Sequence, residues 1–139
     1  MIHLHPLSAD TKERLQDAGL SLTEVAGIIA TALAEDLGNG VDITSVATIP
    51  EGQTCAVTFG AREAGVVAGL PVAAAVIDTV CGPEGSFDYL ADDGDRVTAG
   101  TPVARVDAPT RAMLTAERTA LNLLCHLSGV ATLTRCWAD

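Results

Sequence analysis

Apolar and polar positions follow a helical pattern in the N-terminal part of the chain, where two helices are expected. The first opens within residues 7–10 and ends within residues 18–20, where Gly19 is the usual residue just past a helix end. The second covers residues 21–38, and Ser21 or Thr23 is placed to cap the amide groups at its start. Its apolar residues recur at helical spacing: Val25, Ile28, Ile29, Ala32 and Leu33.

The pattern then changes to the alternation that is typical of strands. Residues 54–61 alternate between apolar and polar side chains, as a strand with one buried face does. The next expected elements are a short strand with a tight bend at 65–70, a helix at 72–80 after Pro71, and a strand at 87–90. A turn at 92–95, a strand at 102–107 and a helix opened by Pro109 follow. Helices and strands fall in separate blocks, which favours an α+β fold over a doubly wound parallel sheet.

The helix after Pro109 has one polar face that begins with arginine. Its polar residues are spaced by four, three and four positions and form one row: Arg111, Thr115, Arg118, Asn122 and, one turn later, His126. The opposite face is an apolar stripe of Met113, Ala116, Ala120, Leu123, Leu124 and Leu127. The row contains neither lysine nor carboxylate, whereas an ordinary solvated helix face mixes the two.

A row led by arginine is suited to a planar anion. The guanidinium group matches a carboxylate or phosphate with two parallel hydrogen bonds, whereas an ammonium group offers only a point charge. The alternative is that Arg111 and Arg118 merely cover the surface or pair with carboxylates of the same chain. The spacing alone leaves both interpretations open.

The net charge of the chain makes these two arginines more informative. The chain has 8 Lys and Arg against 18 Asp and Glu, which gives a formal net charge of -10. This excess of negative charge argues against non-specific binding to nucleic acid or to an anionic membrane surface. No apolar run approaches the roughly 20 residues of a membrane span. Lys12 is the only lysine. An anionic ligand would therefore have to meet a local cluster of arginines, and Arg111 with Arg118 is the helical candidate for it.

Length and composition are typical of one globular domain, or of one domain plus part of another. The chain is 48% hydrophobic but only 3% aromatic, so its core is expected to consist of Ala, Val, Leu and Ile. No basic region followed by an apolar stretch opens the chain, which argues against a secretory signal. Cys55, Cys81, Cys125 and Cys136 are far apart and lack metal-site spacing, which predicts reduced, buried thiols in a cytoplasmic protein.

A competing interpretation concerns residues 93–103, which resemble the hairpin of biotinyl and lipoyl carrier domains. Asp93 and Gly94 turn the chain, Val97 is expected to pack inward, and Gly100 permits a second turn. Such carriers need an exposed lysine at the hairpin tip to receive the cofactor, and the chain has no lysine after position 12. The carrier function therefore fails on chemistry, while the strand arrangement remains possible.

Five segments follow one another in a characteristic order. They are Ala34-Glu35-Asp36-Leu37-Gly38, Asp42-Ile43-Thr44, Arg62-Glu63-Ala64-Gly65-Val66-Val67-Ala68-Gly69, Thr115-Ala116-Glu117-Arg118-Thr119-Ala120-Leu121-Asn122 and His126-Leu127-Ser128-Gly129. Each is weak alone, but together they make the chain resemble quinolinate phosphoribosyltransferase, or nicotinate-nucleotide pyrophosphorylase (carboxylating). The resemblance implies transfer of phosphoribose from phosphoribosyl pyrophosphate to quinolinate. Decarboxylation then gives nicotinate mononucleotide, pyrophosphate and CO2, a step of NAD biosynthesis.

The resemblance also implies a domain arrangement. The family is a type II phosphoribosyltransferase with an N-terminal α/β sandwich followed by an α/β barrel, and the chain resembles the first half. Residues 1–126 are then the sandwich domain, and residues 127–139 begin the connection to a barrel that lies beyond Asp139. The family's Mg²⁺ site, which acts with phosphoribosyl pyrophosphate, and its catalytic residues are expected in that barrel. We therefore expect the 139-residue chain to be inactive by itself.

One residue receives a direct role from the resemblance. Arg118 matches the arginine of the family's N-terminal domain that reaches quinolinate in the barrel of the partner subunit, which implies a homodimer or higher homo-oligomer. The other members of the row receive no direct role and are expected to support the site: Arg111, Thr115, Asn122 and His126. An exposed apolar surface around Leu127, Val130, Leu133 and Trp137 is expected to face the barrel and to favour self-association.

Two other functions remain open at this point. The first is that of the molybdenum-transport-associated relative of the same family, which the chain also resembles. The second is a non-catalytic module that uses the arginine row to bind an anion or a protein partner. A following barrel with clustered Lys and Arg and paired acidic residues would favour the enzyme.

Overall fold

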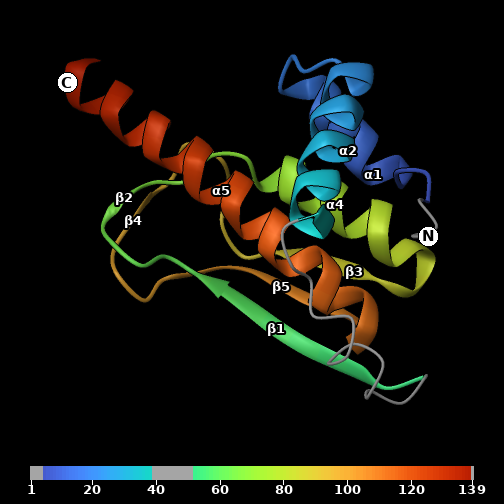
Figure 1. Cartoon of the computed structure of the whole chain (residues 1–139). Coiled ribbons are helices and arrows are strands. Elements are labelled where there is room, and N and C mark those ends of the chain that lie inside the picture. Colours follow the sequence, from blue (N-terminus) through green and yellow to red (C-terminus); the bar gives the residue numbers. More distant parts are fainter. Residues whose placement is uncertain (1–4, 39–51, 139) are drawn as a thin grey trace.

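The computed structural model describes residues 5–38 and 52–138, and the side chains described are those of residues 5–35 and 52–128. Its elements follow one another along the chain as shown in Figure 1. They are α1 (Ala9–Asp17), α2 (Leu22–Gly38), β1 (Thr54–Gly60), β2 (Gly65–Val66), α4 (Leu70–Cys81), the short 3-10 helix η1 (Gly82–Glu84), β3 (Ser86–Tyr89), β4 (Arg96–Val97), β5 (Pro102–Pro109) and α5 (Thr110–Ala138).

Three strands form the main sheet in the order β1-β5-β3, and β5 pairs antiparallel with both neighbours. Successive side chains of a strand point to opposite faces, so the sheet has an inner and an outer face. The inner face carries apolar residues such as Phe59 and Val106, which are buried. The outer face carries exposed polar residues, and Arg105 of β5 lies between Thr58 and Asp88 of its neighbours. The alternation of apolar and polar residues along the strands therefore predicts which face of the sheet is buried.

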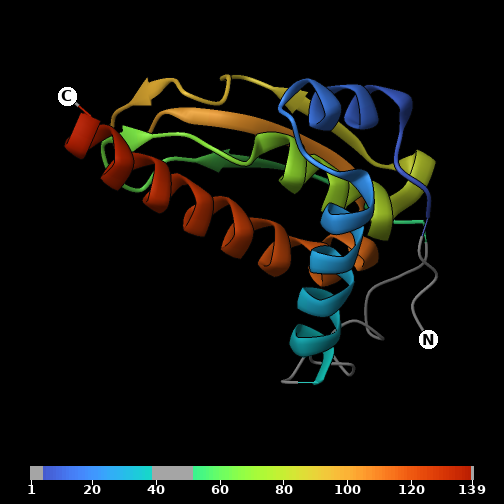
Figure 2. The ribbon, with the colours of Figure 1, turned by 90° about the horizontal axis from the view of Figure 1, so that it is seen from above.

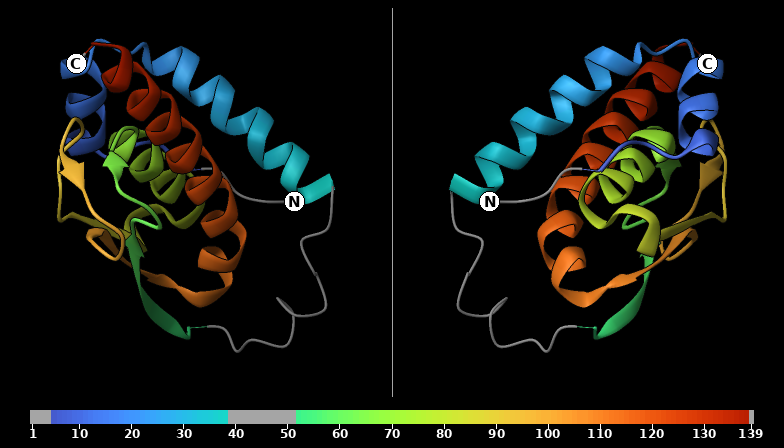
Figure 3. Two further views of the ribbon diagram at one scale, coloured as in Figure 1. Left: turned by 90° about the vertical axis from the view of Figure 1, so that its left-hand side faces the viewer. Right: turned by 90° about the vertical axis from the view of Figure 1, so that its right-hand side faces the viewer.

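The helices form a layer on one face of the sheet. Helices α4 and α5 pack against each other and cover the inner face, as Figure 2 shows from above. Helix α2 contacts both of them from the side away from the sheet (Figure 3), while α1 packs against α4. Helices and strands thus occupy separate layers, which confirms the predicted α+β class.

The core is built from aliphatic side chains and alanine, as the composition predicts. Its largest fully buried side chains include Leu15, Ile29, Leu70, Ile77, Met113 and Val106. Alanines are buried on both central helices, among them Ala73 and Ala75 of α4 and Ala116 and Ala120 of α5. Small side chains let two helices approach closely, and alanines form part of the buried face of both α4 and α5.

Polar contacts attach α1 to α4. The Ser8 hydroxyl caps α1 by accepting from the Thr11 amide at 3.2 Å. The Asp78 carboxylate of α4 accepts from the Ser8 amide at 3.1 Å and from the Thr11 hydroxyl at 2.5 Å. Thr11 is buried, and these bonds satisfy its hydroxyl group in the interior.

The predicted elements are confirmed with shifted ends. Helix 72–80 begins earlier, at Leu70, and the strand 102–107 continues to Pro109, where α5 begins at once. The sequence reasoning missed the two-residue strand β4, which pairs Val97 with Gly65 of β2. Such short strands carry too few residues for an alternating pattern. The segment 42–44 of the family pattern lies outside the described residues.

Helix α5 runs through the last part of the described chain. It continues to Ala138 and crosses the predicted domain boundary between residues 126 and 127 without a break. That boundary stays a prediction, because a continuous helix is compatible with a boundary along its length.

Two expectations about single side chains on α5 are wrong. Cys125 is exposed rather than buried. Leu127 is half-buried against Gly69 rather than part of an exposed patch. The side chains of Val130, Leu133, Cys136 and Trp137 lie outside those described.

Within the part of the chain described, no single helix combines the length and the hydropathy that crossing a membrane requires. Helices α1 and α2 meet that criterion only when taken as a pair, and the pair is bent by 110°.

The single tyrosine of the chain gives a direct test of the packing of α1 on the sheet. Tyr89 lies on β3 with the Arg14 guanidinium 3.7 Å from its ring centroid. Burial raises the pKa of Tyr89 to about 12, and the charge of Arg14 opposes that rise. A raised pKa means that the Tyr89 contribution to stability is complete below about pH 10, the unfolded value, and is lost as pH rises through the folded value.

We therefore expect tyrosinate absorbance of the folded protein to appear only as pH rises toward 12, together with loss of folded structure. In denaturant the same titration should have its midpoint near 10, as for a free tyrosine, to within about one unit. A folded protein that titrates at the denatured value would show that Tyr89 is solvated and that α1 does not cover it.

Candidate functional site

The polar row lies on a helix whose start is fixed by the sheet. Strand β5 runs into α5 without an intervening loop, and the Thr110 amide donates to the Gln53 carbonyl at 2.8 Å. The buried side of α5 carries Met113, Ala116, Ala120 and Leu124, each no more than 6% exposed. The predicted apolar stripe is therefore the face that packs on the core, and the polar row lies away from it.

The structure brings the five residues of the row onto one face of α5, as predicted. Arg118, Asn122 and His126 are exposed, while Arg111 and Thr115 are half-buried. The Thr115 hydroxyl donates to the Arg111 carbonyl at 3.4 Å, so it already bonds within its own helix. The exposed members of the row are therefore the ones placed to contact a ligand or another chain.

Sequence reasoning missed an apolar residue beside the row. Leu114 is 41% exposed and lies one turn before Arg118, about 40° around the helix. It belongs to neither the polar row nor the apolar stripe, so the helical pattern gave it no role. Cys125 is exposed as well. The surface around Arg118 therefore includes apolar and polar contacts, as the surface around an aromatic anion would require.

Two loops hold the second half of α5. We call this contact the junction, and it consists of the loop residues 67–70 and 92–95 together with residues 127–128 of α5. The Ser128 hydroxyl accepts from the Ala68 amide at 3.0 Å and donates to the Ala68 carbonyl at 3.1 Å. Gly69 packs so closely against Leu127 that a Cβ atom added at Gly69 would lie only 2.6 Å from Leu127 Cδ1, which is too close unless one of the two residues shifts. Gly69 also has φ of +93°, which favours glycine. Two of the segments in the family pattern, 62–69 and 126–129, thus meet here.

Asp93 completes the junction from the other side. Its carboxylate accepts from the Gly69 and Leu70 amides, both at 3.0 Å. These amides lie at the start of α4, where the helix dipole favours negative charge. The chain's own carboxylate thus occupies the α4 N-terminus, which excludes it as a binding site for a substrate phosphate group in this conformation.

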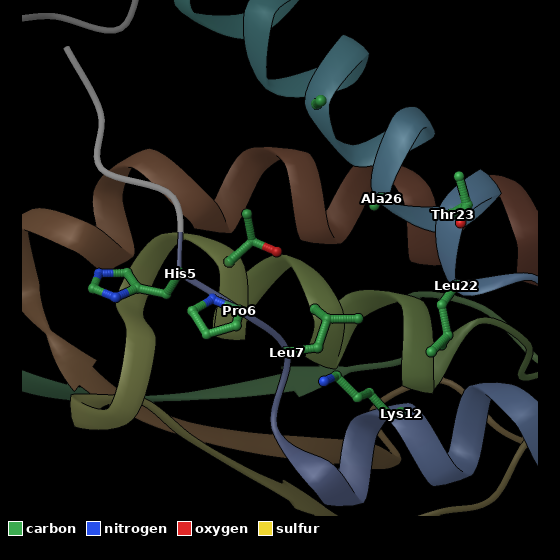
Figure 4. Close-up of a pocket in the computed structure, with 9 residues that line it drawn as sticks. His5, Pro6, Leu7, Lys12, Leu22, Thr23 and Ala26 are labelled. Carbon is green, nitrogen blue, oxygen red and sulfur yellow. The ribbon is translucent and has the colours of Figure 1, made fainter.

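A separate groove of about 490 Å³ lies between the N-terminal segment, α1, α2 and α4 (Figure 4). It is lined by His5, Pro6, Leu7, Lys12, Leu22, Thr23, Ala26, Ala30 and Thr79. None of the five residues of the row lines it. Among the described residues, no three His, Cys, Asp or Glu side chains gather as ligands for a metal ion.

The sequence model of the quinolinate phosphoribosyl transferase N-terminal domain matches residues 42–128. The chain belongs to this family. The match ends at Ser128, so it includes the arginine row, residues 111–126, and all parts of the junction.

Individual relatives agree with this assignment. The nicotinate-nucleotide pyrophosphorylase [carboxylating] of Mycobacterium leprae is 48% identical over 112 residues, which are 80% of this chain and 39% of that protein. The plant protein of the same name from Arabidopsis thaliana is 36% identical over 116 residues, or 84% of this chain and 33% of its own length. This chain thus spans about two fifths or less of these relatives.

Solved structures show the same fold. NadC from Streptococcus pyogenes superimposes with a TM-score of 0.73 at 36% identity, over 83% of this chain and 41% of that one. The nicotinate-nucleotide pyrophosphorylase of Ehrlichia chaffeensis superimposes with a TM-score of 0.74 at 30% identity, over 86% of this chain and 42% of that one. The fold of the family's N-terminal domain, predicted from the five segments, is confirmed.

Proposed function

We propose that this chain provides the N-terminal domain of a quinolinate phosphoribosyltransferase of NAD biosynthesis. The enzyme transfers phosphoribose from phosphoribosyl pyrophosphate to quinolinate and releases pyrophosphate and CO2. The observation that carries the proposal is the arginine row on α5, with Arg118 exposed, in a chain that belongs to this family. In a chain of net charge -10, a row without carboxylates is a local exception that suits an anionic substrate.

Arg118 is the residue that we assign to quinolinate. This substrate carries two adjacent carboxylates on a pyridine ring, and its ring nitrogen must be held toward the sugar carbon. A guanidinium group holds a carboxylate by two parallel hydrogen bonds and fixes the orientation of the ring. Orientation of this kind can contribute several kcal/mol to lowering the barrier. Arg118 is exposed in the isolated domain, where a second subunit has room to cover it.

The other members of the row have supporting roles in this proposal. Arg111 is half-buried two turns before Arg118 and adds positive charge along the same face. Asn122 and His126 lie one and two turns after it and are exposed. They are placed to contact the subunit that covers the row, while Thr115 bonds to its own helix.

The donor end of the reaction belongs outside this chain. Loss of pyrophosphate leaves positive charge on the ribose, and a metal ion with cationic groups stabilises the departing anion. We place Mg²⁺ and these groups in a C-terminal barrel, and we place the quinolinate site between the barrel of one subunit and the α5 row of the other. The enzyme is then a cytoplasmic homodimer or a higher homo-oligomer.

The experiment that tests this function is product analysis with an enzyme that joins this chain to a C-terminal barrel. Supplied with quinolinate, phosphoribosyl pyrophosphate and Mg²⁺, it should form nicotinate mononucleotide, pyrophosphate and CO2 in equal amounts. Nicotinate in place of quinolinate should give little product, since it lacks one of the two carboxylates by which the site is proposed to hold the ring. A folded dimer that forms no product would instead favour the molybdenum-transport-associated relative or a binding module.

A further inference from the structure

The direction in which Arg118 extends depends on how α5 is rotated about its own axis. A rotation of the helix by one residue step, about 100°, would carry the whole row away from its position. Between Met113 and Leu124, two of the five buried residues of α5 are alanines, Ala116 and Ala120, so these two positions do little to oppose smaller rotations. Alanine has no side-chain atoms beyond Cβ that could interlock with α4. A directional contact elsewhere on α5 would therefore help to fix the rotation of the helix about its axis.

Ser128 makes such a contact. One hydroxyl both accepts from the amide and donates to the carbonyl of Ala68, at 3.0 and 3.1 Å. Both bonds require the Ser128 side chain to face the backbone of Ala68, so they fix the rotation of α5 at this point. Ser128 is ten residues after Arg118, which is about 15 Å along a continuous helix.

The backbone that Ser128 contacts is itself held in place. The four consecutive amides of residues 67–70 all donate to partners outside their own segment: Asp95 O at 3.0 Å, Ser128 Oγ at 3.0 Å, and the two Asp93 oxygens at 3.0 Å. The Gly94 amide donates back to the Val67 carbonyl at 2.7 Å. Leu127 packs against Gly69 at the same point. Ser128 therefore bonds to a fully paired loop, which makes the junction a firm anchor.

We propose that Ser128 is a positioning residue for quinolinate binding, which acts by fixing the rotation of α5 and through it the direction of the Arg118 guanidinium. The inference rests on the proposed role of Arg118. Ser128 does not touch the substrate in this account. Its effect reaches the substrate along the helix that joins the two residues.

The first test is Ser128→Ala in the enzyme that contains this chain. We expect KM for quinolinate to rise on the order of tenfold, since small misplacements of a binding group are costly, while kcat and KM for phosphoribosyl pyrophosphate change little. Ser128→Thr, which keeps the hydroxyl, should recover most of the loss. Thr79→Ala is the matched control: it removes a hydroxyl that donates at 2.7 Å within its own helix, to Ala75, and should leave KM unchanged.

The second test asks whether Ser128 acts through Arg118. In an Arg118→Ala background, Ser128→Ala should cause no further rise in the quinolinate KM, because the group it positions is gone. An unchanged KM in folded Ser128→Ala, or an equal rise in both backgrounds, overturns the inference and leaves the proposed function standing. An unchanged KM in Arg118→Ala overturns the role of Arg118 and this inference with it. If Ser128→Ala does not fold, Ser128→Cys, of similar size but weaker hydrogen bonding, enters the same comparisons.

Discussion

Purified by itself, the 139-residue chain is expected to form no nicotinate mononucleotide from quinolinate and phosphoribosyl pyrophosphate in the presence of Mg²⁺. Phosphoribosyl transfer needs groups that hold the donor, its metal ion and the leaving pyrophosphate. The described residues hold no cluster of metal ligands, and the start of α4 is occupied by Asp93. The proposed role of the arginine row is limited to quinolinate, and the proposed donor groups lie in a C-terminal barrel, so we expect no turnover at all.

The measurement is product formation by the purified chain, with circular dichroism to establish that it is folded. The same chain joined to a C-terminal barrel serves as the positive control and should be active under identical conditions. Turnover by the 139-residue chain alone would contradict the account and would require a complete site within these residues.

The sequence predicted most of the fold because its long elements carry clear periodicity. The alternation at 54–61 and the apolar stripe of α5 both correspond to faces that the structure buries. The sequence did not predict that β2 and β4 pair, because two residues are too few for a period and the two pairs of partners, Gly65 with Val97 and Val66 with Arg96, are distant in the sequence. Pairing of this kind depends on tertiary contacts that no local pattern reports.

The candidate site was predictable in part, for a similar reason. The arginine row follows from helical spacing within one element, and the structure confirms that its members share a face. The junction joins Ser128, Ala68 and Asp93 from three separate segments, and nothing local in the sequence relates them. Asp93 was assigned to a turn, although its carboxylate also caps α4. The exposure of Leu114 and Cys125 depends on which neighbouring elements cover α5.

The second large effect is expected from Arg118→Ala in the enzyme that contains this chain. In the proposed site, the substitution would remove a charge-assisted contact of two parallel hydrogen bonds to a carboxylate, at a place that the second subunit is proposed to cover. Its loss should cost on the order of 2–4 kcal/mol, or roughly 30- to 1,000-fold in kcat/KM for quinolinate. Affinity for phosphoribosyl pyrophosphate should stay near the wild-type value, because Arg118 is assigned to quinolinate. Folding of this domain should not change either, because the Arg118 side chain is exposed on it.

Two further variants separate charge from geometry. Arg118→Lys should recover only part of the loss, since the ammonium group keeps the charge but not the planar fork. Arg105→Ala is the matched control: it also removes one exposed arginine, on the outer face of the sheet beside Asp107 at 3.5 Å. It should leave quinolinate kinetics unchanged. If net charge alone mattered, Arg105→Ala and Arg118→Ala would have similar effects.

The position of Arg118 relative to the dimer is tested by mixing. Arg118→Ala subunits combined with subunits inactivated in the barrel should regenerate activity, because one of the two sites in each mixed dimer is then intact. Random exchange would restore about a quarter of all sites. Stable mixed dimers without activity would leave Arg118 in the quinolinate site but place it in the site of its own subunit.

The most direct test of the central claim, that Arg118 of this chain binds quinolinate, is the quinolinate KM of folded Arg118→Ala enzyme at saturating phosphoribosyl pyrophosphate. We expect that KM to rise by at least about tenfold, the equivalent of 1.4 kcal/mol, while the Arg105→Ala control stays at the wild-type value. A quinolinate KM and a kcat that both equal those of the wild type would remove Arg118 from the site.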